Sequence, residues 1–154
     1  MACYDEWWLR KDMENMGFLF EYCDKYCREL YGVDIDKKVL LTAFMNSRFR
    51  KEMEEGHPKF LSQAAKDSLR QWINVDYEGD LSGFRYTGDE ESYNYHQFYW
   101  IGWIYAYIHF RSKHSSRDII AAIPIDEMLE QYYLCHEMDR RVYYNRIEGR
   151  LQAG

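Results

Sequence analysis

The sequence predicts a single all-α domain, residues 1–154, built from about six helices. The chain is long enough for one domain with its own core, and only two prolines and nine glycines interrupt its 154 residues. Apolar side chains recur at steps of three and four residues through most of the chain. Residues 93–110 are apolar or aromatic at thirteen of eighteen positions, with no strand-like alternation. These observations predict a central, aromatic-rich helix at about residues 92–112, surrounded by other helices.

This central segment is a poor candidate for a membrane span. Its apolar run covers residues 98–110, which is shorter than the roughly 20 residues that a span requires. The run is also rich in tyrosine, a residue that buries well in a protein core when its hydroxyl finds a partner. We therefore expect a helix buried inside a domain, and no contact with a membrane.

The first helix is expected between Asp5 and Tyr31, where apolar residues share one broad face. Gly17 weakens the middle of this stretch, which leaves one kinked helix or two helices open. Gly32 stands where a left-handed C-cap would end the helix. The periodicity thus predicts a long helix whose apolar face packs on the core.

The second helix is expected over residues 36–56, with Asp34 or Asp36 as its N-cap. A glycine and a proline directly after it indicate a firm end. A shorter third helix begins at Ser62 and covers residues 62–73. We expect the second helix to pack against the central one.

Residues 74–91 are expected to form a long loop, with a short hairpin at residues 81–86 as an option. Three of the nine glycines fall here, beside an acidic excess and scattered apolar residues. Loops of more than about 15 residues in compact domains are either functional or mobile. This loop is therefore the predicted contact surface for a partner.

Three helices are expected after the central one, each with a recognisable start. Residues 116–123 follow a cap at Ser115 or Ser116, residues 125–135 open at Pro124 or Asp126, and residues 138–151 end the chain. We expect the core to consist of the central helix packed against the first, second and last helices.

The charge distribution favours a protein partner over a nucleic acid. The formal net charge is −6, and it lies in the first 91 residues, because residues 92–154 hold seven basic and seven acidic groups. An acidic protein repels phosphate backbones, whereas it attracts a basic protein surface. The predicted contact residues are the acidic side chains of the long loop, namely Asp76, Glu78, Asp80, Asp89, Glu90 and Glu91.

The four cysteines are expected to be reduced thiols in a cytosolic protein, since no basic start and apolar run suggest secretion. Cys23 and Cys27 lie four residues apart, so a helix places both on one face, where zinc binding with Cys135 or His136 would be an option. Structural zinc sites usually contain a tighter C-x2-C pair and a second pair, which this chain lacks. We therefore expect buried thiols, no metal and no cofactor.

Two histidines of the central segment are also expected to act separately. His96 and His109 lie thirteen residues apart, which places them on nearly opposite sides of a straight helix. A shared metal is therefore not expected. We expect each ring to be satisfied by a carbonyl or a neighbouring hydroxyl.

A candidate functional cluster consists of Arg48, His136, Glu137 and Asp139. The last three resemble half of the H-E-x-x-H metalloprotease motif, but the second histidine is absent. The local interpretation is that Asp139 N-caps the last helix and His136 bonds a carbonyl at the end of the preceding one. Arg48 belongs to a basic group near the end of a predicted helix, where neighbouring glutamates cancel its field. No complete catalytic motif is present in the sequence.

Three blocks in the last two-thirds of the chain carry a family resemblance. They are Ser47-Arg48-Phe49-Arg50 with Glu54, Gly56 and Pro58, then Tyr99 to Trp103 through Tyr107 to Ser116, and then Ile123-Pro124, Met128, Tyr132 or Tyr133, and His136 to Asp139. Together they resemble a small family of Firmicutes proteins similar to antitoxin-like partners of ADP-ribosyltransferase-type toxins. The resemblance implies a protein partner, a toxin-like enzyme encoded nearby.

We therefore expect a non-catalytic, acidic protein-binding module, an antitoxin or inhibitor that neutralises its partner. One alternative is a phage-encoded inhibitor of a host defence protein. Another is a small enzyme with a pocket near His136 and Glu137, which would act as an acid–base pair. A pocket with perturbed carboxylates beside His136 would favour the enzyme, and an exposed flat patch would favour binding. The sequence leaves the oligomeric state open.

Overall fold

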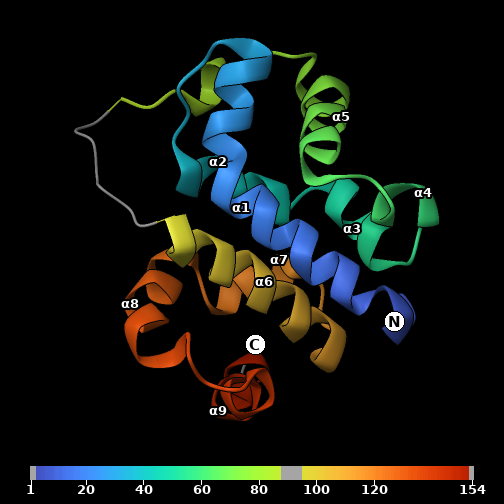
Figure 1. The fold of residues 1–154 in the computed structure, drawn as a ribbon, viewed down its shortest axis with the longest axis vertical. Coiled ribbons are helices and arrows are strands. Elements are labelled where there is room, and N and C mark those ends of the chain that lie inside the picture. Colours follow the sequence, from blue (N-terminus) through green and yellow to red (C-terminus); the bar gives the residue numbers. More distant parts are fainter. Residues whose placement is uncertain (1–2, 88–94, 153–154) are drawn as a thin grey trace.

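The computed structural model describes residues 3–87 and 95–152, and it shows an all-α single domain (Figure 1). Within these residues there are nine α-helices, two short 3-10 helices and no strand. The elements are η1 (Glu6–Trp8), α1 (Leu9–Tyr31), α2 (Lys37–Met45), α3 (Arg48–Glu54), α4 (Pro58–Leu61), α5 (Ala65–Tyr77), η2 (Ser82–Phe84), α6 (Tyr95–Ser112), α7 (Ser116–Ala122), α8 (Ile125–Cys135) and α9 (Arg140–Gln152). The all-α prediction is confirmed, and the number of helices exceeds the expected six.

The centre of the fold is the crossing of the two longest helices, α1 and α6 (Figure 1). A Cβ added at Gly102 of α6 would overlap the backbone carbonyl of Met16, and one added at Gly17 of α1 would meet the Tyr99 ring at 2.6 Å. Both glycines therefore let the two helices approach closely. Gly17 does not divide α1, which is one continuous helix of 23 residues.

Most of the circumference of α6 is buried, as its composition predicted, and Tyr99, Trp103 and Phe110 are half-buried along one side. Side chains that point in different directions around it are inaccessible to solvent, namely Phe98, Ile101, Ile104, Tyr105, Ala106 and Ile108. Helices α7, α8 and α9 cover the part of α6 that α1 leaves open. The second helix was expected to pack against α6, but α2 mainly contacts α1, α3, α7 and α8.

The single helix expected over residues 36–56 is two helices, and this is one reason for the larger count. Ser47 has extended backbone angles, and its hydroxyl accepts a hydrogen bond from the Arg50 amide at 3.0 Å, which starts α3. A similar break precedes α5. Pro58 begins the short α4, and the third predicted helix therefore starts at Ala65 and not at Ser62.

The long loop expected over residues 74–91 is largely ordered structure where the model describes it. Residues 74–77 continue α5, so the helix ends later than predicted. Leu81 and Phe84 are buried, at the N-cap and the last residue of η2. The hairpin expected at residues 81–86 is absent, because this segment pairs with residues 34–36 through the Ile35–Arg85 bridge.

Most helix ends follow the local signals in the sequence. Gly32 ends α1 in the left-handed conformation with φ 67°, and the Asp36 carboxylate caps α2. Ser115 caps α7, and Pro124 precedes α8. No helix in the described part of the chain is long and apolar enough to cross a membrane.

Candidate functional site

A buried ion pair lies beneath the surface where α1, α3 and α7 meet. The guanidinium of Arg50 donates from Nη1 to Asp12 Oδ1 at 2.6 Å and from Nη2 to Asp12 Oδ2 at 2.9 Å. Both side chains are inaccessible to solvent. Because a buried charge is very costly without a partner, this two-point geometry is required for either group to stay ionised.

Further polar groups extend the pair into a network. Glu54 Oε1 lies 3.3 Å from Arg50 Nε and accepts the Ser116 amide at 2.9 Å. The Tyr4 hydroxyl donates to Asp12 Oδ2 at 2.6 Å. The network therefore ties together the segment before η1, the helices α1 and α3, and the start of α7.

The charges of the network shift the pKa values of its members. Burial alone would raise the pKa of Asp12, but the charge and hydrogen bonds of Arg50 and the Tyr4 hydroxyl hold it below its usual value. Burial and the Asp12 charge raise the pKa of Tyr4. The Asp12 and Glu54 charges raise the pKa of Arg50 although burial opposes this. With these shifts, the Asp12 carboxylate is ionised and the Tyr4 phenol is neutral.

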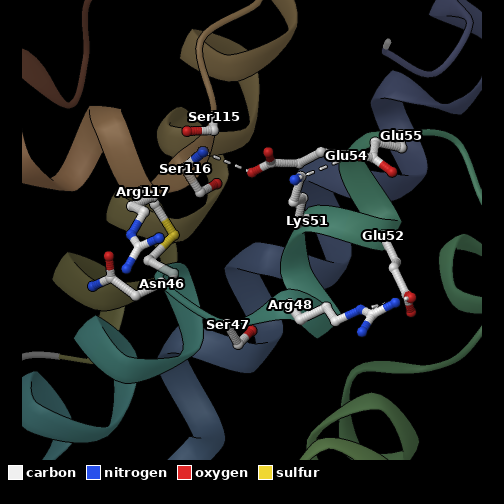
Figure 2. Close-up of a pocket in the computed structure, with 11 residues that line it drawn as sticks. Asn46, Ser47, Arg48, Lys51, Glu52, Glu54, Glu55, Ser115, Ser116 and Arg117 are labelled. Atoms are coloured by element: carbon white, nitrogen blue, oxygen red, sulfur yellow. Dashed lines mark hydrogen bonds and ion pairs between the residues drawn. The ribbon is translucent and has the colours of Figure 1, made fainter. Parts of the chain in front are cut away.

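An open groove of about 500 Å³ lies above this network (Figure 2). Glu54 and Ser116 belong to both the groove and the network, so the two are directly connected. Figure 2 shows Asn46 and Arg117 on one side of the groove and Lys51 on the other. The groove is lined by Met45, Asn46, Ser47, Arg48, Lys51, Glu52, Glu54, Glu55, Ser115, Ser116 and Arg117.

The groove carries charges of both signs, and most are already paired. Arg48 Nε lies 3.5 Å from Glu52, and Lys51 Nζ lies 3.9 Å from Glu55. The hydroxyls of Ser47 and Ser115 accept hydrogen bonds from backbone amides at the starts of α3 and α7. A groove of this kind suits weak polar contacts, and its serines are not placed as nucleophiles beside a base.

The predicted functional cluster is not one site. Arg48 lines the groove at α3, whereas His136, Glu137 and Asp139 lie at the turn between α8 and α9, on another side of the molecule (Figure 1). His136 Nδ1 donates to the Tyr132 carbonyl at 2.7 Å, and its ring stacks on that of Tyr132.

The local interpretation of this turn is confirmed. Asp139 accepts the Arg141 amide at 2.8 Å and opens α9, as a helix N-cap does. Glu137 is 89% exposed, and its carboxylate lies 3.9 Å from His136 Nε2. The groove above the buried network and a second groove beside α1 are both lined by other residues.

Among the described residues, no three His, Cys, Asp or Glu side chains are grouped as a metal ion would need. Cys23 and Cys27 both lie inside the apolar core. His109 bonds the His114 carbonyl at 2.7 Å, as expected for a ring satisfied on its own.

Three of the six predicted contact residues lie in the described part of the chain, and all three are exposed. Asp76 is in the last turn of α5, Glu78 is its C-cap, and Asp80 follows. Glu78 has a positive φ of 53°, a conformation usually left to glycine. The other three, Asp89, Glu90 and Glu91, lie outside the described residues.

Sequence reasoning missed the buried network, although one signal was present. Asp12 lies between Leu9 and Met16 on the apolar face of the first helix, where a carboxylate is out of place. A charged residue on such a face indicates a buried partner. The identity of that partner, Arg50, depends on contacts 38 residues away.

Comparisons of this chain with protein-family models, curated proteins and solved structures returned no match.

Proposed function

We propose that this protein is a non-catalytic module that binds another protein through the acidic end of α5. The observation that carries the proposal is the placement of Asp76, Glu78 and Asp80. All three are exposed and follow one another at the C-terminal end of a helix. We refer to these three residues as the acidic corner.

The acidic corner lies where a helix end disfavours carboxylates, although two of them have local partners. Asp76 accepts the Trp72 indole N–H at 2.9 Å, and Asp80 accepts the Ser82 amide at 2.9 Å. The C-terminal end of a helix carries a partial negative charge, so carboxylates there are repelled and basic side chains are preferred. The last turn of α5 contains no basic residue. A basic surface of a partner would supply the missing positive charge, and complementary charge of this kind speeds association.

The conformation of Glu78 adds a second cost at the same place. A left-handed residue other than glycine costs roughly 1–2 kcal/mol, and Glu78 has a φ of 53°. Strained residues of this kind often lie at functional sites. Val75 is 70% exposed next to the acidic corner, so a partner could also make an apolar contact there.

The proposed partner is a protein with a basic surface. The family resemblance of the three sequence blocks supports an antitoxin-like role, in which the partner is a toxin-like enzyme encoded nearby. An inhibitor of a host defence protein would use the same acidic surface, so the resemblance alone distinguishes the two. The enzyme alternative has less support, because Glu137, the other member of the pair, is 89% exposed and lies 3.9 Å from His136 Nε2.

The test is co-expression with the product of the neighbouring gene, followed by measurement of growth and of complex formation. We expect the parent protein to restore growth and to bind the partner more weakly as salt is raised. The variant with Glu78→Lys and Asp80→Lys should fold normally and lose most of the binding. Its reversed charge would repel a basic surface.

A matched control carries the same change of charge elsewhere. Glu130 in α8 and Glu148 in α9 are exposed, so the pair Glu130→Lys and Glu148→Lys should bind as the parent does. Equal binding by both double variants would show that the acidic corner is not part of the interface. Absence of any complex, together with an enzymatic turnover that disappears in His136→Ala, would replace the binding proposal with the enzyme.

A further inference from the structure

The thiol of Cys3 lies against the ring of His109, although the two residues are 106 positions apart in sequence. Cys3 Sγ is 3.6 Å from His109 Nε2, within hydrogen-bond distance for sulfur. The other three cysteines, Cys23, Cys27 and Cys135, are buried, whereas Cys3 is half-buried. Cys3 is therefore the thiol that a reagent reaches in the folded protein.

The contacts of the ring decide which nitrogen faces the thiol as a base. His109 Nδ1 lies 2.7 Å from the His114 carbonyl, and a carbonyl only accepts hydrogen bonds. Nδ1 must therefore carry the proton, which leaves the lone pair of Nε2 directed at the sulfur. This is the arrangement of a nucleophile beside an oriented base.

Two charged groups flank the pair. The carboxylate of Glu54 has Oε2 at 3.6 Å from His109 Nδ1, so it would stabilise the ring after protonation. Lys113 Nζ lies 3.8 Å from Cys3 Sγ and would stabilise a developing thiolate. Lys113 has a positive φ of 66°, and its ammonium group lies 4.0 Å from the centre of the Phe110 ring. The ammonium is therefore held by the fold on the side of the thiol.

The resting protonation states fit a thiol beside a neutral base. Burial raises the pKa of Cys3, and Lys113 only partly offsets this. Burial also lowers the pKa of His109 although Glu54 opposes the effect. At neutral pH the proton stays on sulfur and the ring can accept it during a reaction. Because the raised pKa of Cys3 lowers the thiolate fraction, the reaction depends on proton transfer to His109 Nε2.

We propose that Cys3 and His109 form a thiol–imidazole site that reacts with small hydroperoxides. The sulfur attacks the terminal oxygen, the S–O bond forms and the O–O bond breaks. His109 Nε2 takes the thiol proton and passes it to the departing oxygen, which leaves as water or an alcohol. Sulfur is oxidised by two electrons to a sulfenic acid, and the hydroperoxide is reduced by the same two electrons. A small uncharged oxidant suits a half-buried thiol.

The experiment compares the full chain, folded and unfolded in urea, in its reaction with hydrogen peroxide at pH 7. Sulfenic acid is trapped with dimedone, and labelling at Cys3 is followed by mass spectrometry. General-base assistance typically contributes about 100-fold or more, so we expect at least about tenfold faster labelling of Cys3 in the folded chain. Cys23, Cys27 and Cys135 should show the opposite order, because the fold buries them. Labelling of Cys3 at the same rate or more slowly in the folded chain would overturn the proposal.

Two variants distinguish general-base assistance by His109 from the effect of the solvent exposure of Cys3. His109→Asn keeps an N–H near the position of Nδ1 for the His114 carbonyl and removes Nε2, so Cys3 should react no faster than in unfolded protein. Lys113→Gln should slow the reaction by a smaller factor, since it removes only the ammonium. Thermal melting confirms that each variant is folded. A folded His109→Asn variant with the parent rate would show that the ring does not act as a base.

Discussion

The carboxylate of Asp12 in α1 and the guanidinium of Arg50 in α3 form a two-point ion pair that is fully shielded from solvent. The pair joins two helices that make few other contacts, since α1 packs mainly on α5 and α6. Glu54 and Ser116 extend the contact to α7. The position of α3 therefore depends on electrostatic contacts inside an apolar core, and this can be tested directly.

Asp12→Ala should destabilise the protein by about 3–5 kcal/mol, because it leaves the Arg50 charge buried without its main partner. Arg50→Met should be costly for the same reason. The double variant Asp12→Ala with Arg50→Met should lose less stability than the sum of the two single losses, since neither member of the pair remains without the other, although Glu54 loses the Arg50 charge. Urea denaturation of the purified variants measures these differences.

The exposed pair Arg10–Glu14 supplies the control for this series. Arg10 Nε lies 3.2 Å from Glu14, and the two side chains are 90% and 44% exposed. Glu14→Ala should change the free energy of unfolding by less than about 1 kcal/mol. Additive costs in the Asp12–Arg50 double variant would contradict a coupled buried pair.

Stability should fall as the pH is lowered from 7 to 5. Burial lowers the pKa of His109 from its ordinary value of 6.5, so the unfolded chain binds a proton in a range where the folded chain does not. Protonation therefore favours the unfolded state once the pH drops below about 6.5. A second loss should follow below about pH 4, where Asp12 is protonated in the unfolded chain before the folded one.

Urea denaturation at pH values between 8 and 3 tests this dependence. His109→Asn should give a flatter curve between pH 7 and 5 and should keep the loss at lower pH. An unchanged slope in that variant would assign the first loss to other groups.

Gly102→Ala should destabilise the crossing of α1 and α6 by several kcal/mol. The added Cβ would overlap the Met16 carbonyl and approach the Phe20 ring, and a backbone atom in a helix cannot move aside cheaply. Gly149→Ala in α9 is the matched control, because nothing lies within 4 Å of the added atom. This second change should stabilise by about 0.5–1 kcal/mol through helix propensity. Thermal melting that shows equal effects for both would refute the close crossing.

Glu78→Gly should raise the free energy of unfolding by about 1 kcal/mol, because glycine adopts the left-handed conformation without strain. The same variant should weaken binding to the partner proposed above, since it removes one charge of the acidic corner. Urea denaturation and a binding titration measure the two effects separately. Glu130→Gly within α8 is the matched change and should lower stability instead. A stability loss in Glu78→Gly would show that this side chain is needed for the fold.

Elements with local causes could be predicted from the sequence. The end of α1 at Gly32, the cap of α2 at Asp36, and the local roles of His136 and Asp139 all depend on neighbours within a few residues. The break at Ser47 was also a local signal, but the continuous apolar periodicity of residues 36–56 concealed it. Local signals thus located most helices and missed some of their boundaries.

The sequence by itself determined that a largely buried helix lies at about residues 92–112, seen in the structure as α6, since apolar side chains occur on every side of it. It also determined that the charge lies in the first 91 residues. Only the tertiary structure decided that α7 and α8, and not α2, cover α6 beside the predicted last helix α9, and that Asp12 meets Arg50 and Cys3 meets His109. Periodicity and caps act over a few residues, whereas these pairs come together only when the whole chain has packed.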